Sequence, residues 1–397
     1  MGTLFLYELR KLIRQRYLVF FIILLLGVNL FNIYLNYDAL LSPQQYVKDG
    51  ETFALTPLRL QMDRDYEGKI TNVKLARLKA HRDAAEAIFS GGDGGNETMY
   101  TPYPYSDMNF AGEIITEMQR LYTYHDTVIG AVLQKNAALK AQAQTVNDSF
   151  RLRQAQLIEK TYTGRSLDSY YRVNAFETVF SYRLSALFLV LLSVYSAAFL
   201  FAGEKENGML PLLKCTPKKR VLFAAKAAAF FNFVSGVGIL FFSADLLMFW
   251  LCLRPSGFLQ PFYAIEGYTY SVLNVNVVTA YLLTSFLRVL GAFLIGCAVM
   301  LLSVLLPKAW HAFFGGALLT AALMAISLFT DGVFGALRFF DPVTLLISIR
   351  LFETFRVVNV LGHPVFMYVV ALFGSLLFGA FSLTGTWLVY KRRRGYA

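Results

Sequence analysis

Six apolar segments, each long enough to cross a lipid bilayer as a helix, constrain this chain of 397 residues more than any other feature. Backbone groups in lipid must form hydrogen bonds within their own segment, so such runs indicate membrane-spanning helices. The composition agrees, because only 16% of residues are charged, against about 25% in soluble domains. An ordinary soluble enzyme and a disordered chain are therefore excluded. The predicted spans cover residues 17–35, 184–202, 221–253, 279–306, 309–329 and 365–390.

The first span follows a basic stretch, as the apolar core of a cleaved signal peptide also does. Its apolar run is too long for a signal peptide, and no small-x-small cleavage site follows it. We therefore expect residues 1–35 to keep this span as an anchor.

The formal charge of +11 is concentrated at the span ends. Basic residues gather before the first span, between spans two and three, at Lys308 between spans four and five, and after span six. With six spans these four regions share one face of the membrane, which the positive-inside rule predicts to be cytoplasmic. We expect a multi-pass protein of the cell membrane, in a bacterium the plasma membrane, with both termini cytoplasmic. The same placement argues against nucleic acid as a partner, since no basic patch stands apart from the spans.

Residues 36–182 form a nearly neutral, polar insert that is long enough to fold as a domain. Apolar residues recur at helical spacing over residues 70–89 and 112–136, and a weaker stripe continues to about residue 160. The prediction is an all-α integral membrane protein with six transmembrane helices and a mainly helical extracytoplasmic domain. The other five spans lie in residues 183–397.

Two ionisable residues, Asp245 and Arg288, lie inside predicted spans three and four. Charges in the membrane are costly and often functional. Both lie about 12–14 Å below the same boundary at a rise of 1.5 Å per residue, so an intramembrane ion pair is predicted. Such a pair would clamp the two helices, and a role in a substrate path is the alternative.

The segment between spans two and three, residues 203–220, carries the motif that points to function. Its Leu210 and Leu213 would form an apolar face on a short helix that begins acidic and is followed by basic residues. It resembles the first cytoplasmic loop of type-2 ABC exporter permeases, whose short helix docks on the partner ATPase. A plain topogenic loop is the alternative. The residues that carry the resemblance are Glu204, Glu206, Gly208, Leu210, Leu213, Pro217 and Arg220, with Lys226 in the next span.

Two further regions are similar to that family. The stretch with Arg10, Lys11, Arg14 and Arg16 looks like its amphipathic helix on the inner membrane surface. Residues 331–364 resemble its outer re-entrant segment. The long insert departs from the short first outer loop of many members. Members with large outer domains handle peptides or lipids, and the resemblance implies export of a peptide, lipid or drug-like substrate.

The chain has no Gly-x-x-x-x-Gly-Lys-Ser/Thr motif and so no P-loop for ATP. The resemblance therefore implies an ABC ATPase partner in two copies that holds ATP and Mg, and a second permease, identical or related. The chain itself is expected to be no enzyme and to hold no cofactor or metal, because His-Glu-x-x-His and Gly-x-Ser-x-Gly are both missing. The alternatives are an antimicrobial-peptide sensing or resistance complex that acts through the outer domain, and a membrane scaffold without transport.

Overall fold

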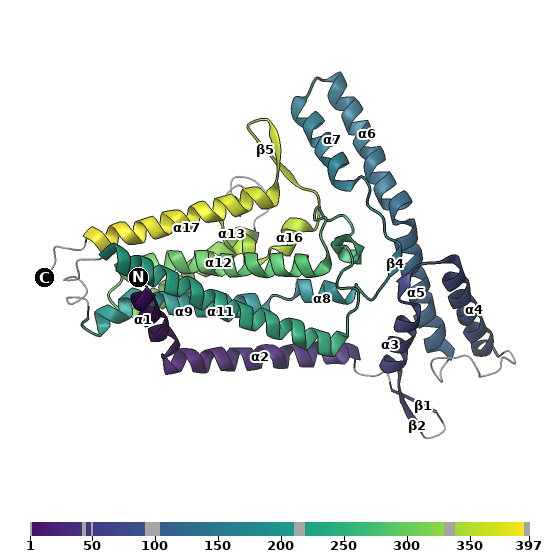
Figure 1. Cartoon of the computed structure of the whole chain (residues 1–397), viewed down its shortest axis with the longest axis horizontal. Coiled ribbons are helices and arrows are strands. Elements are labelled where there is room, and N and C mark those ends of the chain that lie inside the picture. The colour runs from purple at the N-terminus through teal and green to yellow at the C-terminus, as the bar shows by residue number, and fades with distance from the viewer. Residues whose placement is uncertain are drawn as a thin grey trace.

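The computed structural model describes residues 2–41, 45–48, 51–91, 104–209, 219–328 and 338–392. For residues 37–58 it describes the backbone elements only. The chain consists mainly of helices, which form a long bundle and a helical head at one end of it (Figure 1). Helix α1 and the end of α17 lie at the opposite end of the bundle (Figure 1).

Six helices in the described residues are long and apolar enough to cross a membrane, as the sequence predicts, so this is a multi-pass membrane protein. Their ends agree with the predicted spans to within a few residues, except that α2 continues past the predicted end of the first span. A seven-residue helix, α8 (Ala175–Ser181), leads directly into the second of them. The six are α2 (Arg16–Leu41), α9 (Leu184–Glu206), α11 (Lys219–Leu253), α12 (Val277–Leu305), α13 (Ala309–Leu328) and α17 (Met367–Arg392).

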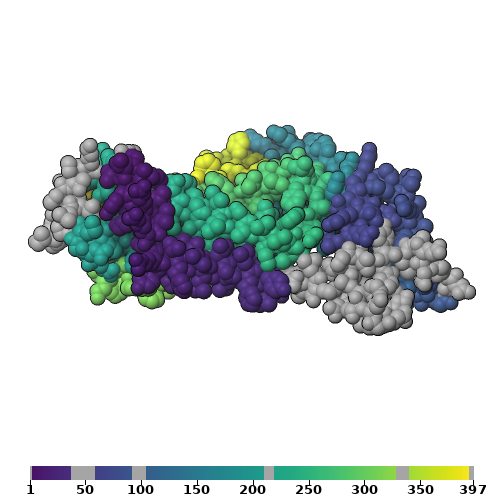
Figure 2. All heavy atoms as spheres, turned by 60° about the horizontal axis from the view of Figure 1, so that its bottom comes forward, coloured from purple at the N-terminus to yellow at the C-terminus, as the bar shows by residue number. Residues whose placement is uncertain are grey.

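Helices α9 and α12 form the buried centre of the bundle, and α11, α13 and α17 pack around them. Small residues allow this close approach, as they commonly do between membrane helices. At Gly296 of α12, a Cβ atom would collide with the ring of Phe230 and lie 2.6 Å from the Ser193 hydroxyl. Helix α2 packs against α11 and leaves most of its own surface exposed on the outside of the bundle (Figure 2).

The head contains the helices that the sequence predicts within the insert. Helix α4 packs against α5, and α6 pairs with α7 as a hairpin. The predicted helix over residues 112–136 is the middle of a longer rod, in which the π-helical turn η2 (His125–Ile129) joins α5 to α6. Thr71 and Asp148 cap the N-termini of α4 and α7 by accepting backbone N–H groups. The head helices are α3 (Leu55–Tyr66), α4 (Asn72–Phe89), α5 (Pro104–Tyr124), α6 (Gly130–Thr145) and α7 (Ser149–Tyr162).

Arg165 fastens the head to the bundle. Its buried guanidinium lies over the rings of Tyr162 and Tyr263, 4.7 Å and 4.6 Å from their centroids. Its Nη1 donates to the Ser271 carbonyl at 2.7 Å. Tyr263 belongs to the loop after α11, which holds two 3-10 turns, η3 (Phe262–Ala264) and η4 (Glu266–Tyr268). The head therefore packs against the ordered loop that follows α11.

Between α13 and α17 the structure has short elements where the sequence predicts a re-entrant segment. A 3-10 turn, η5 (Arg338–Phe340), is followed by α15 (Val343–Leu346) and α16 (Ile349–Phe352). An unpredicted β-hairpin then forms from β5 (Val357–Val360) and β6 (His363–Phe366), and its turn places Leu361 and Gly362 at positive φ. Residues 331–337 of the predicted segment lie outside the described residues. Two further antiparallel pairs, β1 (Gln45–Lys48) with β2 (Glu51–Ala54) and β3 (Gly68–Lys69) with β4 (Ser169–Tyr170), were also unpredicted.

Candidate functional site

Four charged side chains meet at the end of the bundle that holds α1, and we call them the charge cluster: Glu8, Lys11, Glu204 and Lys226. Lys226 of α11 contacts both carboxylates, with its Nζ 3.0 Å from Oε2 of Glu8 and in direct contact with Oε1 of Glu204. Lys11 Nζ lies 2.6 Å from the same oxygen of Glu204. Lys226 is fully buried, and the two glutamates are 2% and 3% exposed. Two cations and two carboxylates thus balance one another, and of the four only Lys11 is partly exposed to solvent.

The cluster joins three helices. Glu8 lies on α1 (Gly2–Ile13), Glu204 lies in the last turn of α9, and Lys226 lies in the third turn of α11. The N-terminal helix and the helices on both sides of residues 207–218 are therefore tied together by buried charge. The sequence motif contains Lys226 and Glu204 but gives no role to Glu8. A signal was present, because Glu8 is four residues from the buried Leu12 and so lies on the same, inward face of α1.

The end of α9 is also fastened to the turn between α12 and α13. Lys205 Nζ donates to three carbonyls at the end of α12, at distances of 2.6–2.8 Å. Glu206 accepts the backbone N–H of Ala309, the first residue of α13, at 2.9 Å. Both contacts satisfy helix-terminal groups and match the helix dipoles. Gly208 then ends α9 with a φ of +66°, the left-handed conformation that glycine adopts most easily after a helix.

The predicted coupling residues divide into two groups. Glu204, Glu206 and Gly208 form the end of α9 just described, and Arg220 is exposed in the first turn of α11. The other predicted positions, Leu210, Leu213 and Pro217, lie outside the described residues.

Helix α1 has the predicted basic face, with one difference. Arg10, Arg14 and Arg16 are exposed at its end and at the start of α2. Lys11 instead points inward to Glu204. Lys11 therefore neutralises the buried carboxylate of Glu204 and does not face the lipid head groups as predicted.

Asp245 and Arg288 are both buried, but the predicted direct ion pair between them does not form. Asp245 accepts hydrogen bonds from Asn29 at 2.5 Å and from the hydroxyl of Ser185, so it joins α11 to α2 and α9. Arg288 donates to the Phe180 carbonyl at 2.8 Å. That carbonyl is available because the helical hydrogen bonding is interrupted between α8 and α9.

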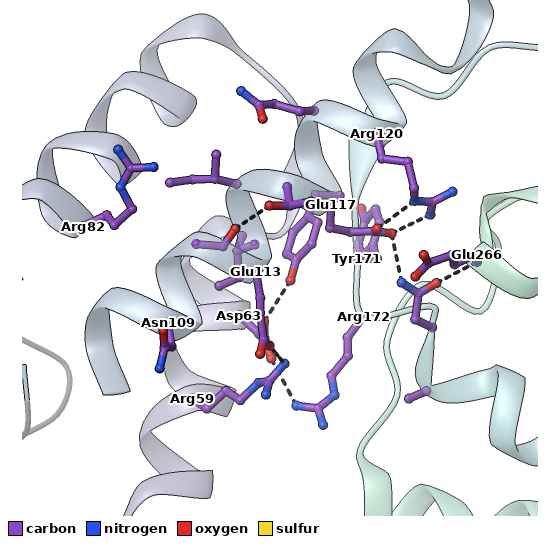
Figure 3. Close-up of a pocket in the computed structure, with 18 of the residues that line it drawn as sticks. Arg59, Asp63, Arg82, Asn109, Glu113, Glu117, Arg120, Tyr171, Arg172 and Glu266 are labelled. Carbon is purple, nitrogen blue, oxygen red and sulfur yellow. Dashed lines mark hydrogen bonds and ion pairs between the residues drawn. The ribbon is translucent and has the colours of Figure 1, made fainter. Parts of the chain in front are cut away.

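A pocket of about 1110 Å³ lies between the head and the bundle (Figure 3). Its walls come from α3, α4 and α5 of the head, and Leu253 and Glu266 line it from the bundle side. Five basic and five acidic side chains line it, which no motif in the sequence indicates. Their separation along the chain hides the site, because residues as far apart as Arg59 and Glu266 meet there.

Three ion pairs give this pocket a fixed lining. Arg120 forms a two-point contact with Glu117 at 2.6 and 2.8 Å. The other two pairs are Arg59 with Glu113 at 2.5 Å and Arg172 with Asp63 at 3.0 Å.

Tyr170 completes this lining by donating to Asp63 at 2.8 Å. Burial, and then the neighbouring Asp63 carboxylate, raises the pKa of Tyr170, so its hydroxyl keeps the proton that it donates.

Within the described residues, no group of three or more His, Cys, Asp or Glu side chains could hold a metal ion. No protein-family model matches the chain, and a search of curated proteins finds no match.

Proposed function

We propose that this chain is the membrane-spanning permease subunit of an ATP-driven exporter of the type-2 ABC class. The observation that carries the proposal is the charge cluster, which joins the helices on both sides of residues 207–218 to α1. In this proposal that segment receives the movement of a separate ATPase. ATP and Mg bind to the ATPase and not to this chain.

The cluster gives such a movement a route into the membrane. Because Glu204 and Lys226 are in direct contact, displacement of the segment reaches α9 and α11 together. Separating them would leave buried charges without partners, which costs about 3–5 kcal/mol in proteins. Both helices and α1 therefore move as one unit rather than separately. The contacts of Lys205 and Glu206 extend the same unit to α12 and α13.

The remaining features of the proposal follow from the charges at this end. Exposed Arg10, Arg14, Arg16 and Arg220 would lie at the cytoplasmic surface of the bacterial plasma membrane, close to lipid head groups. The head would then be extracytoplasmic. Two copies of the ATPase and a second permease, identical or related, would complete the assembly.

The test is co-purification of this chain with the ATPase, followed by measurement of ATP turnover. Leu210→Asp and Leu213→Asp should weaken the complex, because each places a charge on the proposed docking face. Leu139→Asp is the matched control, since Leu139 is an exposed leucine on α6 of the head. If both segment variants assemble and turn over ATP as the control does, the coupling proposal is wrong.

A further inference from the structure

The pocket between the head and the bundle runs along one helix of the head, α5. Its lining includes a continuous stripe of α5 from Met108 to Arg120. At 1.5 Å per residue this stripe is about 18 Å long. An extended peptide spans about 3.3–3.6 Å per residue, so about five residues would match this length.

Some of the charged side chains that line the pocket form no ion pair within the described part of the protein. Lys79 and Glu86 of α4 and Glu266 of η4 line it, and none of the three has an ion-pair partner among the described residues. Figure 3 shows Arg82, which is one turn from Lys79 on α4, on the side opposite Glu266. The α4 side of the pocket therefore offers the unpaired charges of Lys79 and Glu86, and the other side offers the unpaired carboxylate of Glu266.

This lining selects against an apolar ligand. A lipid acyl chain would remove these charges from water without replacing their hydrogen bonds, at a cost of several kcal/mol. A chain of amide groups can instead pair with the polar side chains along α5, among them Asn109, Thr116 and Gln119. Asn174 fixes the position of the bundle side of the pocket, because its side chain donates a hydrogen bond to Glu117 and accepts one from the backbone N–H of Glu266.

We propose that this pocket binds a short, extended, hydrophilic peptide that carries charges of both signs, with its acidic end at Lys79 and its basic end at Glu266. Binding to the pocket does not rest on the proposed export function, because every residue of the site belongs to this chain. The two proposals can therefore fail separately. A ligand that contacts both α4 and η4 would also connect the head to the loop that follows α11.

The test is affinity selection with the purified full-length chain in detergent. The probe is a pool of acetylated and amidated pentapeptides made from Asp, Lys, Ser, Gln and Leu, and mass spectrometry identifies the peptides that the protein retains. Peptides with both Asp and Lys should be enriched over neutral and Leu-rich peptides of the same pool. Blocked termini ensure that only side-chain charges are compared.

Charge reversal at the two ends locates the binding site. Lys79→Glu should lower retention of Asp-containing peptides about fivefold, and Glu266→Lys should do the same for Lys-containing peptides, as expected for a partly exposed ion pair. Lys160→Glu is the matched control, because Lys160 is exposed on α7 and does not line the pocket. Equal retention by wild type and both pocket variants would overturn the proposal. So would a pool without enrichment, or displacement of the retained peptides by phosphocholine, which would identify a site for lipid head groups.

Discussion

Replacing Lys226 by Met should destabilise the protein more than any other single change in the charge cluster. The variant leaves Glu8 and Glu204 buried near each other with only Lys11 to neutralise them. Lys11 lies 2.6 Å from Glu204 but 4.0 Å from Glu8, so Glu8 loses its close partner. Removing one member of a buried pair typically costs 3–5 kcal/mol. Because Lys11 compensates in part, we expect a loss of about 3 kcal/mol.

A second substitution tests whether buried charge is the cause. In Lys226→Met with Glu8→Gln, the pair of Lys11 and Glu204 remains and the cluster is neutral again. Replacing a buried ion pair by uncharged groups of similar size is often nearly neutral for stability, so the double variant should recover most of the loss. Thermal unfolding of the purified protein in detergent measures both variants. At about 2–4 °C per kcal/mol, the single variant should unfold roughly 6–12 °C below wild type.

The refuting results are specific to the charge argument. A Lys226→Met protein as stable as wild type would mean that the two carboxylates are not held charged and buried together. A double variant as unstable as the single one would mean that lost packing around the Lys226 side chain, including its position over the Phe201 ring, causes the effect.

Three further predictions test the packing of the bundle and the head. Gly296→Ala should lower the unfolding temperature, by the equivalent of about 1–3 kcal/mol, because the new methyl group overlaps neighbouring side chains. Gly27→Ala is the control and should not lower it, because no atom lies within 4 Å of the added carbon. Asp245→Leu should destabilise the protein more than Asp245→Asn in the same assay, at about 1–2 kcal/mol for each bond in the membrane, because leucine removes the acceptor for both Asn29 and Ser185 whereas asparagine keeps one acceptor oxygen. Arg165→Met should raise amide hydrogen exchange at the junction of head and bundle while the centre of α12 stays protected, and equal exchange in both proteins would remove Arg165 as the fastening residue.

Much of the fold follows from local sequence patterns. The six membrane helices were predicted with ends within a few residues, except at the end of α2, because the length of an apolar run is a property of contiguous residues. Helices α4 to α7 of the head were predicted in the same way from apolar spacing, whereas α3 was not. The β-hairpin before α17 was missed because its strands are only four residues long, too short for a clear alternating pattern.

The sequence by itself determined that this chain crosses a membrane with six helices and which segments do so, because solvation by lipid depends on composition within each segment. Only the tertiary structure decided which charges meet. Asp245 and Arg288 lie at similar depth, yet the rotation of each helix about its axis turns Asp245 toward Asn29 and Ser185, while Arg288 donates to a backbone carbonyl. The same rotations bring Glu8 to Lys226, although 218 positions separate them in the chain. Hydropathy does not specify rotation, and the contacts that carry the proposed function depend on it.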